Sequence, residues 1–267
     1  MHRETFHPVI GPVAEAEALY VKQLRMADRF RASRREFVIW DVGLGAAANA
    51  LTVLRILESV PGAVRLVSFD CTTEPLEFGL EHAAELGYYD GFTAELGSLL
   101  AERRVQFSRQ ETVVDWQLHI ADFPALLQTE EGEAIPKPDA ILFDAYSPAA
   151  NPAMWTLRLF RDIYELLAPV RPCALATYSR STMLRVSLLL AGFYVGSGHA
   201  TGEKEETTIA ANTLDLIAEP LDASWLKRVR KSTSAEPLWE PAYRQAPLSP
   251  DSLDRLQRHP QFHLQAS

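Results

Sequence analysis

This sequence of 267 residues contains few cysteines, fewer basic than acidic side chains and no long apolar runs. Each of these features argues against a class of protein. The only cysteines, Cys71 and Cys173, are far apart and outside any metal-ligand spacing, so we expect two reduced thiols in strands rather than a disulfide. The histidines follow no ligand spacing either, and no metal site is predicted. No apolar stretch is long enough to cross a bilayer, and the N-terminal residues lack the apolar core of a signal peptide. We therefore expect a cytoplasmic protein with no membrane segment.

The net charge of −9 argues against a protein that coats nucleic acid with a uniformly basic surface. The acidic excess belongs to residues 72–133, which carry 13 acidic and 3 basic side chains. Two basic clusters stand apart from it, one spread over residues 25–35 and one at residues 227–231. Each is either an ordinary solvated face or a contact for phosphate, and the sequence leaves both interpretations open.

Apolar residues make up 47% of the chain and charged residues 23%, the proportions of a globular protein with a sizeable core. The length suits one large α/β domain with appendages. We expect residues 1–35 to form an N-terminal lead-in and residues 36–219 to form the domain. Residues 220–267, which are richer in proline, serine and charge, are expected to be a tail packed on it.

Within the predicted domain, short apolar runs alternate with longer helical segments, which is the pattern of a mostly parallel sheet covered on both faces. Strands are predicted at residues 37–41, 64–69, 116–120, 140–143 and 173–178, followed by an antiparallel pair at 193–198 and 207–217. Helices are predicted at 13–30, 46–60, 74–86, 88–101, 124–127, 154–167 and 181–191, and an exposed loop at 129–137. Five alternating units closed by a hairpin are the order expected of a class I, Rossmann-like methyltransferase sheet.

A glycine turn follows the first predicted strand, with Asp41, Gly43 and Gly45 in sequence, and it opens the next helix. This layout places backbone N–H groups and a helix N-terminus beside a bound ligand. Gly43-x-Gly45-x-x-Ala48 also satisfies the fingerprint of an NAD-binding domain. The acid at Asp41 favours S-adenosylmethionine, because methyltransferases of this layout use the pattern acid-x-Gly-x-Gly. A glycine turn without a ligand is the remaining alternative.

Two further acids end neighbouring strands. Asp70 closes the second predicted strand, where a carboxylate can accept hydrogen bonds from two ribose hydroxyls. Asp122 follows the third strand and, with the ring of Phe123, is a candidate clamp for adenine. Asp122 is equally suited to N-cap the short helix that follows it, and both roles can hold at once.

The functional prediction depends most on residues 138–155, an apolar strand that ends in Asp144 and continues into a proline-rich loop. Because ligands in open α/β sheets bind outside the carboxyl ends of the strands, Asp144 and this loop are expected to face a substrate. Pro148 and Pro152 fix φ and remove backbone donors, which stiffens the loop. The alternative is an ordinary strand-to-helix turn in which Asp144 is only a cap.

Three motifs carry a resemblance to a known family. The first, Asp144-Ala145-Tyr146-Ser147-Pro148-x-x-Asn151-Pro152-x-Met154-Trp155, is close to Asp-Gly-Phe-[Ala/Ser]-Pro-x-x-Asn-Pro-x-[Met/Leu]-Trp. The second, Asp41-x-Gly43-Leu44-Gly45-x-Ala47-x-Asn49, parallels Glu-x-Gly-Phe-Gly-x-Gly-x-Asn. The third lies before the sheet and combines Glu4-Thr5-Phe6-His7-Pro8 with Gly11-Pro12-x-x-Glu15-Ala16-x-x-x-Tyr20-Val21. Over residues 4–217 the chain resembles the MnmC-type tRNA (5-methylaminomethyl-2-thiouridine) methyltransferases in their single-domain form, which lacks the FAD-dependent oxidase domain.

The resemblance implies methyl transfer from S-adenosylmethionine to the primary amine of 5-aminomethyl-2-thiouridine at the tRNA wobble position, with the anticodon stem-loop as partner. The predicted cofactor-binding residues, with Asn49 added by the resemblance, are Asp41, Gly43, Gly45, Asn49, Asp70, Asp122 and Phe123. Asp144 is the acid that the cofactor does not need, and we assign it to orienting the acceptor amine and helping to remove its proton. Substrate contacts are expected from Tyr146, as a wall or stacking surface, and from Pro148 and His7.

Two substitutions and the acidity of the chain depart from that family. Ala47 and Ala145 stand where the family has glycine, so the space at the methionine end and the loop after Asp144 are expected to differ. The acidity fits tRNA poorly, although a few Arg and Lys side chains can hold a stem-loop. The alternatives are a methyltransferase acting on another amine or small molecule, an NAD-linked oxidoreductase and a non-catalytic binding protein.

Overall fold

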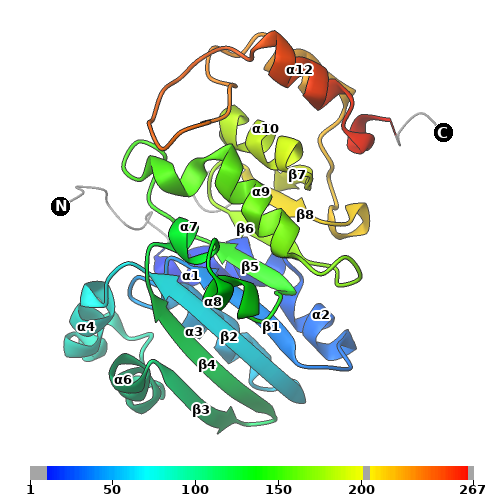
Figure 1. Cartoon of the computed structure of the whole chain (residues 1–267). Helices are drawn as coiled ribbons and strands as arrows, with labels where there is room; N and C mark the ends of the chain where they lie inside the picture. Colours follow the sequence, from blue (N-terminus) through cyan, green and yellow to red (C-terminus); the bar gives the residue numbers. More distant parts are fainter. Residues whose placement is uncertain (1–10, 201–204, 264–267) are drawn as a thin grey trace.

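Buried apolar runs form the strands of one sheet in the computed structural model of the chain, which describes residues 11–200 and 205–263 (Figure 1). The strands lie side by side in the order β3-β4-β2-β1-β5-β6-β8-β7. β1, β2, β4, β5 and β6 pair in parallel, and β7 and β8 form an antiparallel hairpin. The predicted α/β class, a mostly parallel sheet with a terminal antiparallel hairpin, is therefore confirmed. The bounds are β1 Phe37–Val42, β2 Gly62–Asp70, β3 Arg104–Arg109, β4 Thr112–Ile120, β5 Ala140–Phe143, β6 Ala174–Thr177, β7 Tyr194–Gly198 and β8 Thr207–Ala211.

The edge strand β3 has no counterpart among the predicted strands. It pairs antiparallel with β4, and its residues alternate between exposed and half-buried positions. Arg104, Gln106 and Ser108 occupy the exposed positions, so only Val105 and Phe107 contribute an apolar signal. Two apolar residues are too few to mark a strand by periodicity, and the pairing with β4 decides this edge.

Helices cover both faces of the sheet. Their bounds are α1 Pro12–Ala16, α2 Met26–Ala32, α3 Ala48–Leu57, α4 Glu74–Glu81, α5 Ala83–Leu86, α6 Thr93–Glu102, α7 Phe123–Leu126, α8 Glu130–Ala134, α9 Leu157–Leu166, α10 Thr182–Ala191, α11 Ala223–Val229 and α12 Pro250–Gln257. Between α1 and α2 lies a π-helical segment, η1 Glu17–Lys22. Short 3₁₀ turns follow at η2 Pro152–Trp155, η3 Leu214–Leu216 and η4 Pro260–Phe262.

Two of the predicted helices are interrupted. The helix predicted at residues 13–30 is broken at Arg25, whose φ of 50° is left-handed and cannot continue a right-handed helix. The helix predicted at 74–86 is broken at His82, which joins α4 to α5 with φ −109° and ψ 22°. Helix propensity is a property of each residue type and does not locate such breaks, so both predictions are wrong at these points.

Three other predicted bounds also need correction. The helix predicted at 88–101 begins only at Thr93, and the strand predicted at 207–217 ends at Ala211, after which the chain forms η3. Residues 129–137 are not an exposed loop throughout, because they contain the short helix α8, which begins at a capping threonine. The first two errors fall at element ends, which periodicity locates only to within a few residues.

Each strand divides its side chains between two cores, because successive residues point to opposite faces of the sheet. Ile39 and Leu142 belong to the core that also contains residues of α1, η1, α2, α3 and α6, here called the first face. Trp40 belongs to the core shared with α7, α9, α10, α11 and α12, here called the second face. By the same alternation, Asp41 and Asp144 point to the first face.

The segment after residue 219 packs on the second face. Trp225 and Leu238 are buried in that core, and the N–H of Leu157 donates to the carbonyl of Leu238 at 2.9 Å. The side chain of Gln261 is fully buried, and it accepts from the N–H of Val195 and donates to its carbonyl, both at 2.7 Å. α12 lies next to α10, at the end of the molecule farthest from β3 (Figure 1).

Both cysteines are free thiols, as predicted, but neither lies within a strand. Cys71 is exposed just beyond the end of β2, and Cys173 is buried just before β6. Burial raises the pKa of the Cys173 thiol to about 12, so it remains protonated. Across the described ranges, none of the helices has the length and apolar character that a membrane span requires.

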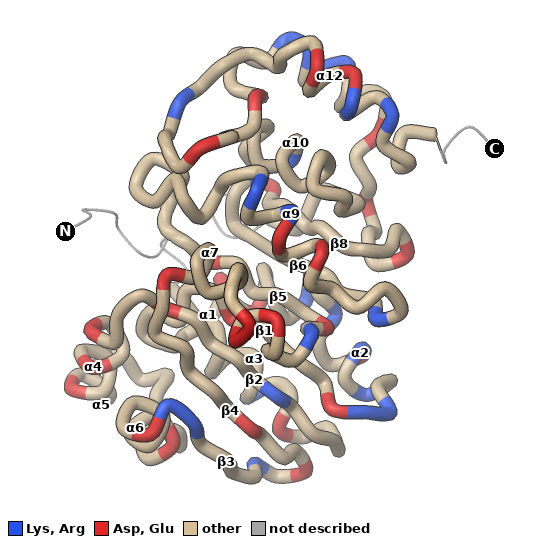
Figure 2. The backbone as a smooth tube through the Cα atoms, in the orientation of Figure 1, with Lys and Arg blue, Asp and Glu red and all other residues tan. Residues whose placement is uncertain are grey.

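The charged side chains separate by region. Acidic residues gather on α4, α5 and α6 (Figure 2). The basic cluster at residues 25–35 is partly structural, because Arg29 donates to the carbonyl of Asp139 at 2.5 Å and Arg35 binds its carboxylate through bonds of 2.6 and 2.9 Å. Asp139 precedes β5, so this cluster lies at the amino ends of the parallel strands, opposite the edge at which they end.

Candidate cofactor and acceptor site

Four acids lie along one edge of the sheet, because the parallel strands β4, β2, β1 and β5 all end there. Asp70 is the last residue of β2, Asp41 is the penultimate residue of β1, and Asp144 directly follows β5. Asp122 comes two residues after β4. The order of the strands therefore places them as Asp122, Asp70, Asp41 and Asp144 along the edge.

The glycine turn joins the ends of three strands. Gly43 has φ +95°, and a Cβ added to it would lie 2.6 Å from the carbonyl oxygen of Asp144, so only glycine fits between β1 and the end of β5. On the other side, the N–H of Gly45 donates to Oδ2 of Asp70 at 2.9 Å. Oδ1 of Asp70 accepts from the N–H of Cys71 at 2.7 Å. The turn thus packs against the backbone of Asp144 on one side and binds the carboxylate of Asp70 on the other.

We expect Gly43→Ala to lower the free energy of unfolding by about 2 kcal/mol or more, because it adds a close contact with Asp144 to the cost of a left-handed alanine. Gly45→Ala is the matched control, since Gly45 has φ +52° but no atom of the described residues outside its chain neighbours lies within 4 Å of its added Cβ. That variant should lose only about 1 kcal/mol, the conformational cost alone. Chemical denaturation of both variants measures the difference, and equal losses would contradict the packing argument.

The two alanines that replace family glycines differ in backbone conformation. Ala47 has φ 59° at the N-cap of α3, in the left-handed region that favours glycine. Ala145 is outside that region, since the described residues other than glycine with positive φ are Arg25, Ala47, Arg103 and Gln110. The loop after Asp144 therefore does not require a glycine here, and the hydroxyl of Tyr178 donates to the carbonyl of Ala145 at 2.9 Å.

Asp41 is fully buried, and its two carboxyl oxygens differ. Oδ2 accepts from the hydroxyl of Ser68 at 2.9 Å, and Ser68 in turn accepts from Nε1–H of Trp116 at 2.9 Å. Oδ1 has no hydrogen-bond partner in the described parts of the chain. Burial raises the pKa of Asp41 to about 7; the Ser68 bond opposes this shift, and the charges of Asp144 and Asp70 add to it. A buried carboxyl oxygen without a partner is a place for a polar group of a ligand.

Asp144 is half-buried between α3 and its own loop. Nδ2 of Asn49 donates to its Oδ2 at 2.7 Å, so α3 orients the acid directly. The last residue of the motif, Trp155, is fully buried, and its Nε1–H donates to the carbonyl of Tyr146 at 2.6 Å. The bond between Trp155 and Tyr146 thus fixes the shape of the loop that the motif forms. The contact by which Asn49 orients Asp144 is not predicted from the sequence.

Tyr20 is a residue of this region that the sequence analysis does not assign to the site. It lies on η1, which packs against α3 and β6, and its side chain is 1% exposed. No partner for its hydroxyl is found among the described residues. Burial, and after it the charges of Asp144 and Asp41, raise the pKa of Tyr20 well above its ordinary value. Its place in the motif that begins at Gly11 is the only signal for it in the sequence.

The predicted adenine clamp has a structural role in this fold. Asp122 is exposed and N-caps α7 by accepting from the N–H of Ala125 at 3.3 Å, as the alternative interpretation predicts. Phe123 is 4% exposed, and its ring packs on Phe69 and Trp40 in the second face. Contact of Asp122 and Phe123 with adenine stays a prediction.

The residues predicted to contact the substrate belong to two segments. Tyr146 and Pro148 are half-buried in the loop after Asp144. The predicted contact residue His7 lies outside the described residues.

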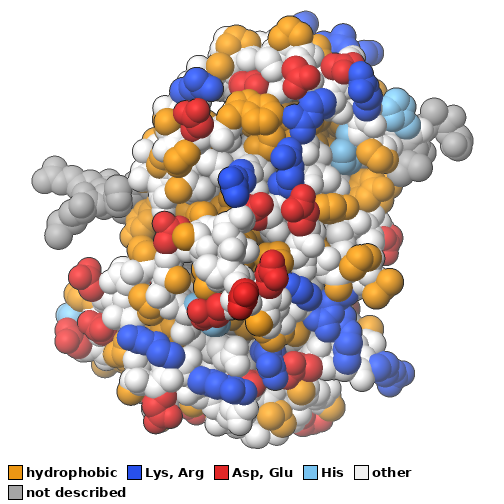
Figure 3. All heavy atoms as spheres, viewed as in Figure 1, with side chains coloured by type: hydrophobic (Ala, Val, Ile, Leu, Met, Phe, Trp, Pro, Cys, Tyr) orange, Lys and Arg blue, Asp and Glu red, His pale blue; other side chains and the backbone are white. Residues whose placement is uncertain are grey.

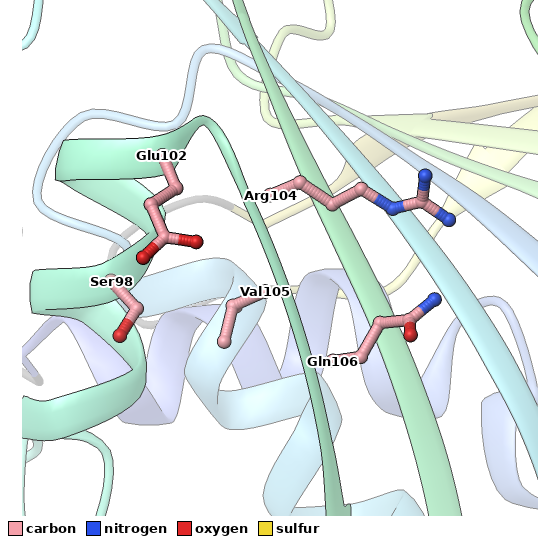
Figure 4. Close-up of a pocket in the computed structure, with 5 residues that line it drawn as sticks. All are labelled: Ser98, Glu102, Arg104, Val105 and Gln106. Carbon is pink, nitrogen blue, oxygen red and sulfur yellow. The ribbon is translucent and has the colours of Figure 1, made fainter.

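A hollow of about 500 Å³ lies elsewhere, beside the edge strand β3 (Figure 4). Glu102 of α6 lines it, but the guanidinium of Arg104 points away from α6 and binds the carboxylate of Asp115 through bonds of 2.9 and 2.6 Å. The hollow lies beside β3, outside the four strands whose ends carry the acids, and it is not the candidate site. Within the described ranges, no group of three or more His, Cys, Asp or Glu side chains could hold a metal ion.

The edge at Asp41 fits S-adenosylmethionine in three respects. Oδ1 of Asp41, which has no partner among residues 11–200 and 205–263, can accept from a cationic group. Among the same residues, no atom outside the chain neighbours of Gly45 lies within 4 Å of its Cβ position, which leaves room above the turn. Asp70 ends the neighbouring strand, and a carboxylate offers about four acceptor positions, so it can also bind ribose hydroxyls. These residues would hold the cofactor on the first face, beside Asp144.

The fold and this edge define a class of enzyme. The family described as S-adenosyl-L-methionine-dependent methyltransferase matches residues 80–213, half of the chain, and the chain belongs to that family. Its cofactor is S-adenosylmethionine, so the NAD-linked and non-catalytic alternatives are set aside.

Individual relatives narrow the comparison. The chain is 27% identical over 227 residues to the tRNA 5-methylaminomethyl-2-thiouridine biosynthesis bifunctional protein MnmC of Methylibium petroleiphilum, covering 83% of this chain and 34% of that protein. It is 28% identical over 215 residues to the protein of the same name from Caulobacter vibrioides, covering 77% of this chain and 35% of that protein. The chain thus spans about a third of the length of these relatives. The crystal structure of MNMC2 from Aquifex aeolicus shares the fold, with a TM-score of 0.64 at 24% identity over 95% of this chain and 77% of that one. The resemblance to MnmC-type methyltransferases is confirmed.

Proposed function

We propose that this chain methylates the primary amine of 5-aminomethyl-2-thiouridine at the wobble position of tRNA, with S-adenosylmethionine as methyl donor. The names of the MnmC relatives support a tRNA substrate. The observation that carries the acceptor assignment is the position of Asp144, whose backbone packs against the glycine turn and whose carboxylate accepts a hydrogen bond from Asn49 at 2.7 Å. This carboxylate lies beside the residues proposed to hold the cofactor, but it belongs neither to the glycine turn nor to β2. It is therefore available to the acceptor.

Asp144 binds the acceptor as an ammonium ion, orients it and helps to remove its proton, which passes to solvent. The cofactor supplies an electrophilic methyl group on a sulfonium sulfur. Aligning the amine lone pair with that methyl and excluding water are the main contributions of the chain. Tyr146 is proposed to stack on the base, with Pro148 and His7 as further contacts.

The proposed partner is the anticodon stem-loop, which also implies a cytoplasmic location. On the face shown in Figure 3, Lys and Arg side chains are mixed with Asp and Glu side chains, and several basic side chains gather at the lower right. A single-stranded loop with splayed bases is recognised by stacking and by contacts with a few cationic side chains, so it requires less basic surface than a long duplex does.

A methyltransferase acting on another amine is the second candidate. It would share every cofactor residue and differ only on the acceptor side. The net charge of −9 favours it, because tRNA binding usually draws on an excess of basic side chains.

Mass analysis of wobble uridines tests the proposal. The protein and S-adenosylmethionine are incubated with tRNA that bears the 5-aminomethyl-2-thiouridine group, and with the same tRNA lacking the aminomethyl group. We expect a gain of one methyl group on the first tRNA and none on the second. Methylation of a small amine without methylation of either tRNA would establish the second candidate instead.

A further inference from the structure

Two buried polar atoms on the first face have no hydrogen-bond partner within the described residues, the hydroxyl of Tyr20 and Oδ1 of Asp41. Folded proteins leave few such atoms, because each lowers stability until a ligand or water completes it. A cationic group of the cofactor would supply the partner for Oδ1 of Asp41. The Tyr20 hydroxyl would still have no partner from the cofactor.

The structure brings Tyr20 to the acceptor side of the site. Its segment η1 packs against α3, which carries Asn49, and Asn49 binds the carboxylate of Asp144 at 2.7 Å. η1 also packs against β6, the neighbour of β5, at whose end Asp144 lies. The segment that carries Tyr20 therefore packs against both the helix that orients Asp144 and the strand next to β5, and the Tyr20 side chain is buried there. Its segment is π-helical, a conformation frequent at functional sites.

We propose that Tyr20 and Asp144 are the two hydrogen-bond acceptors for the acceptor amine, and that Tyr20 thereby limits the enzyme to one methyl group per amine. This inference rests on the proposed function, which makes the acceptor a primary amine. The phenol stays protonated, because burial and the nearby acids raise its pKa, and its oxygen can still accept a hydrogen bond.

The count of N–H groups explains the restriction. A neutral primary amine has two N–H groups and one lone pair. When Asp144 and Tyr20 each accept one N–H, the lone pair is left to attack the methyl carbon. The N–C bond forms, the C–S bond breaks, and its electron pair remains on sulfur. The product loses a proton to Asp144 and then to solvent, which leaves a secondary amine.

The secondary amine no longer matches this pair of acceptors. It has one N–H group, so a second transfer would turn its new methyl toward one of the two oxygens. That acceptor would then be buried without a donor, which opposes the second step.

Tyr20→Phe tests the inference. We expect the rate on aminomethyl-tRNA to fall about tenfold, the loss expected for one hydrogen bond in the site. With tRNA that already bears the methylaminomethyl group, the variant should add a second methyl group, and the wild type should add none. The affinity for S-adenosylmethionine, measured by calorimetry, should be unchanged. The melting temperature without ligand should be equal or higher, because the variant removes an unpartnered hydroxyl.

Tyr164→Phe is the matched control, since Tyr164 lies on α9 and packs against Phe193 on the second face, and it should change neither rate nor product. A Tyr20→Phe enzyme with wild-type rate and a single methyl product would overturn the inference alone. A loss of S-adenosylmethionine binding would also overturn it, because the phenol would then serve the cofactor. A wild-type protein that methylates no aminomethyl-tRNA would overturn the proposed function together with this inference.

Discussion

Asp144→Asn is expected to slow single-turnover methylation of aminomethyl-tRNA by about 10²–10⁴-fold, the range that a positioned acid or base contributes. The amide keeps the shape of the side chain and still offers an oxygen to Nδ2 of Asn49, which now donates at 2.7 Å. It loses the charge that binds an ammonium ion and the base that accepts its proton. Affinity for S-adenosylmethionine should remain within about twofold, because Asp144 is not assigned to the cofactor.

Rapid-quench assays with excess enzyme measure this step without product release. Asp162→Asn provides the matched control, since Asp162 lies on α9 and pairs with Arg158 at 3.7 Å. It should react at the wild-type rate. If Asp144→Asn bound the cofactor normally and kept near-wild-type single-turnover methylation, Asp144 would be a structural acid and the acceptor assignment would be lost.

Asp41→Asn is expected to stabilise the ligand-free protein in a pH-dependent way, by about 4 kcal/mol between pH 4 and pH 8. In the folded chain the pKa of Asp41 is about 7 because the carboxyl is buried, and in the unfolded chain it is near its ordinary value of about 4. Between these values the folded state binds the additional proton, so the wild type loses stability as the pH rises. Asparagine takes up no proton and avoids this loss.

Denaturant unfolding of both proteins across this range measures the effect. The difference in unfolding free energy, variant minus wild type, should grow from pH 4 to pH 7 and then level off. Ser68→Ala extends the test, because it removes the hydrogen bond that lowers the pKa of Asp41 and should shift the plateau to higher pH. A difference that stays flat across the range would show that Asp41 is ionised throughout.

The same carboxyl links stability to cofactor binding. A cationic group held at Oδ1 of Asp41 would lower its pKa, so the affinity of the wild type for S-adenosylmethionine should rise as the pH approaches 7. Asp41→Asn should bind more weakly and without this pH dependence. In the ligand-free protein, the buried carboxylate of Asp41 thus lowers the stability of the fold at the place where the cofactor is proposed to bind.

The sheet and its functional edge could be predicted because they depend on local patterns. Apolar runs such as residues 140–143 mark buried strands, and parallel strands end at a common edge, so acids at strand ends are neighbours. The turn at Gly43 and Gly45 can also be predicted from the sequence, since the left-handed backbone there favours glycine. Strand β3 cannot be predicted in this way, because its exposed polar residues depend on pairing with β4 for their conformation.

Local sequence patterns are enough to predict the α/β class, the glycine turn and the position of Asp144 at the end of a buried strand. The surroundings of that acid depend on contacts between segments that are distant in the sequence. Asn49 is 95 residues away from Asp144 along the chain, and Ser68 is 27 residues away from Asp41. Tyr20 reaches the same face from a segment before the sheet. Hydrogen-bond partners so far apart leave no local pattern, since their contact depends on which face of the sheet each strand and helix presents.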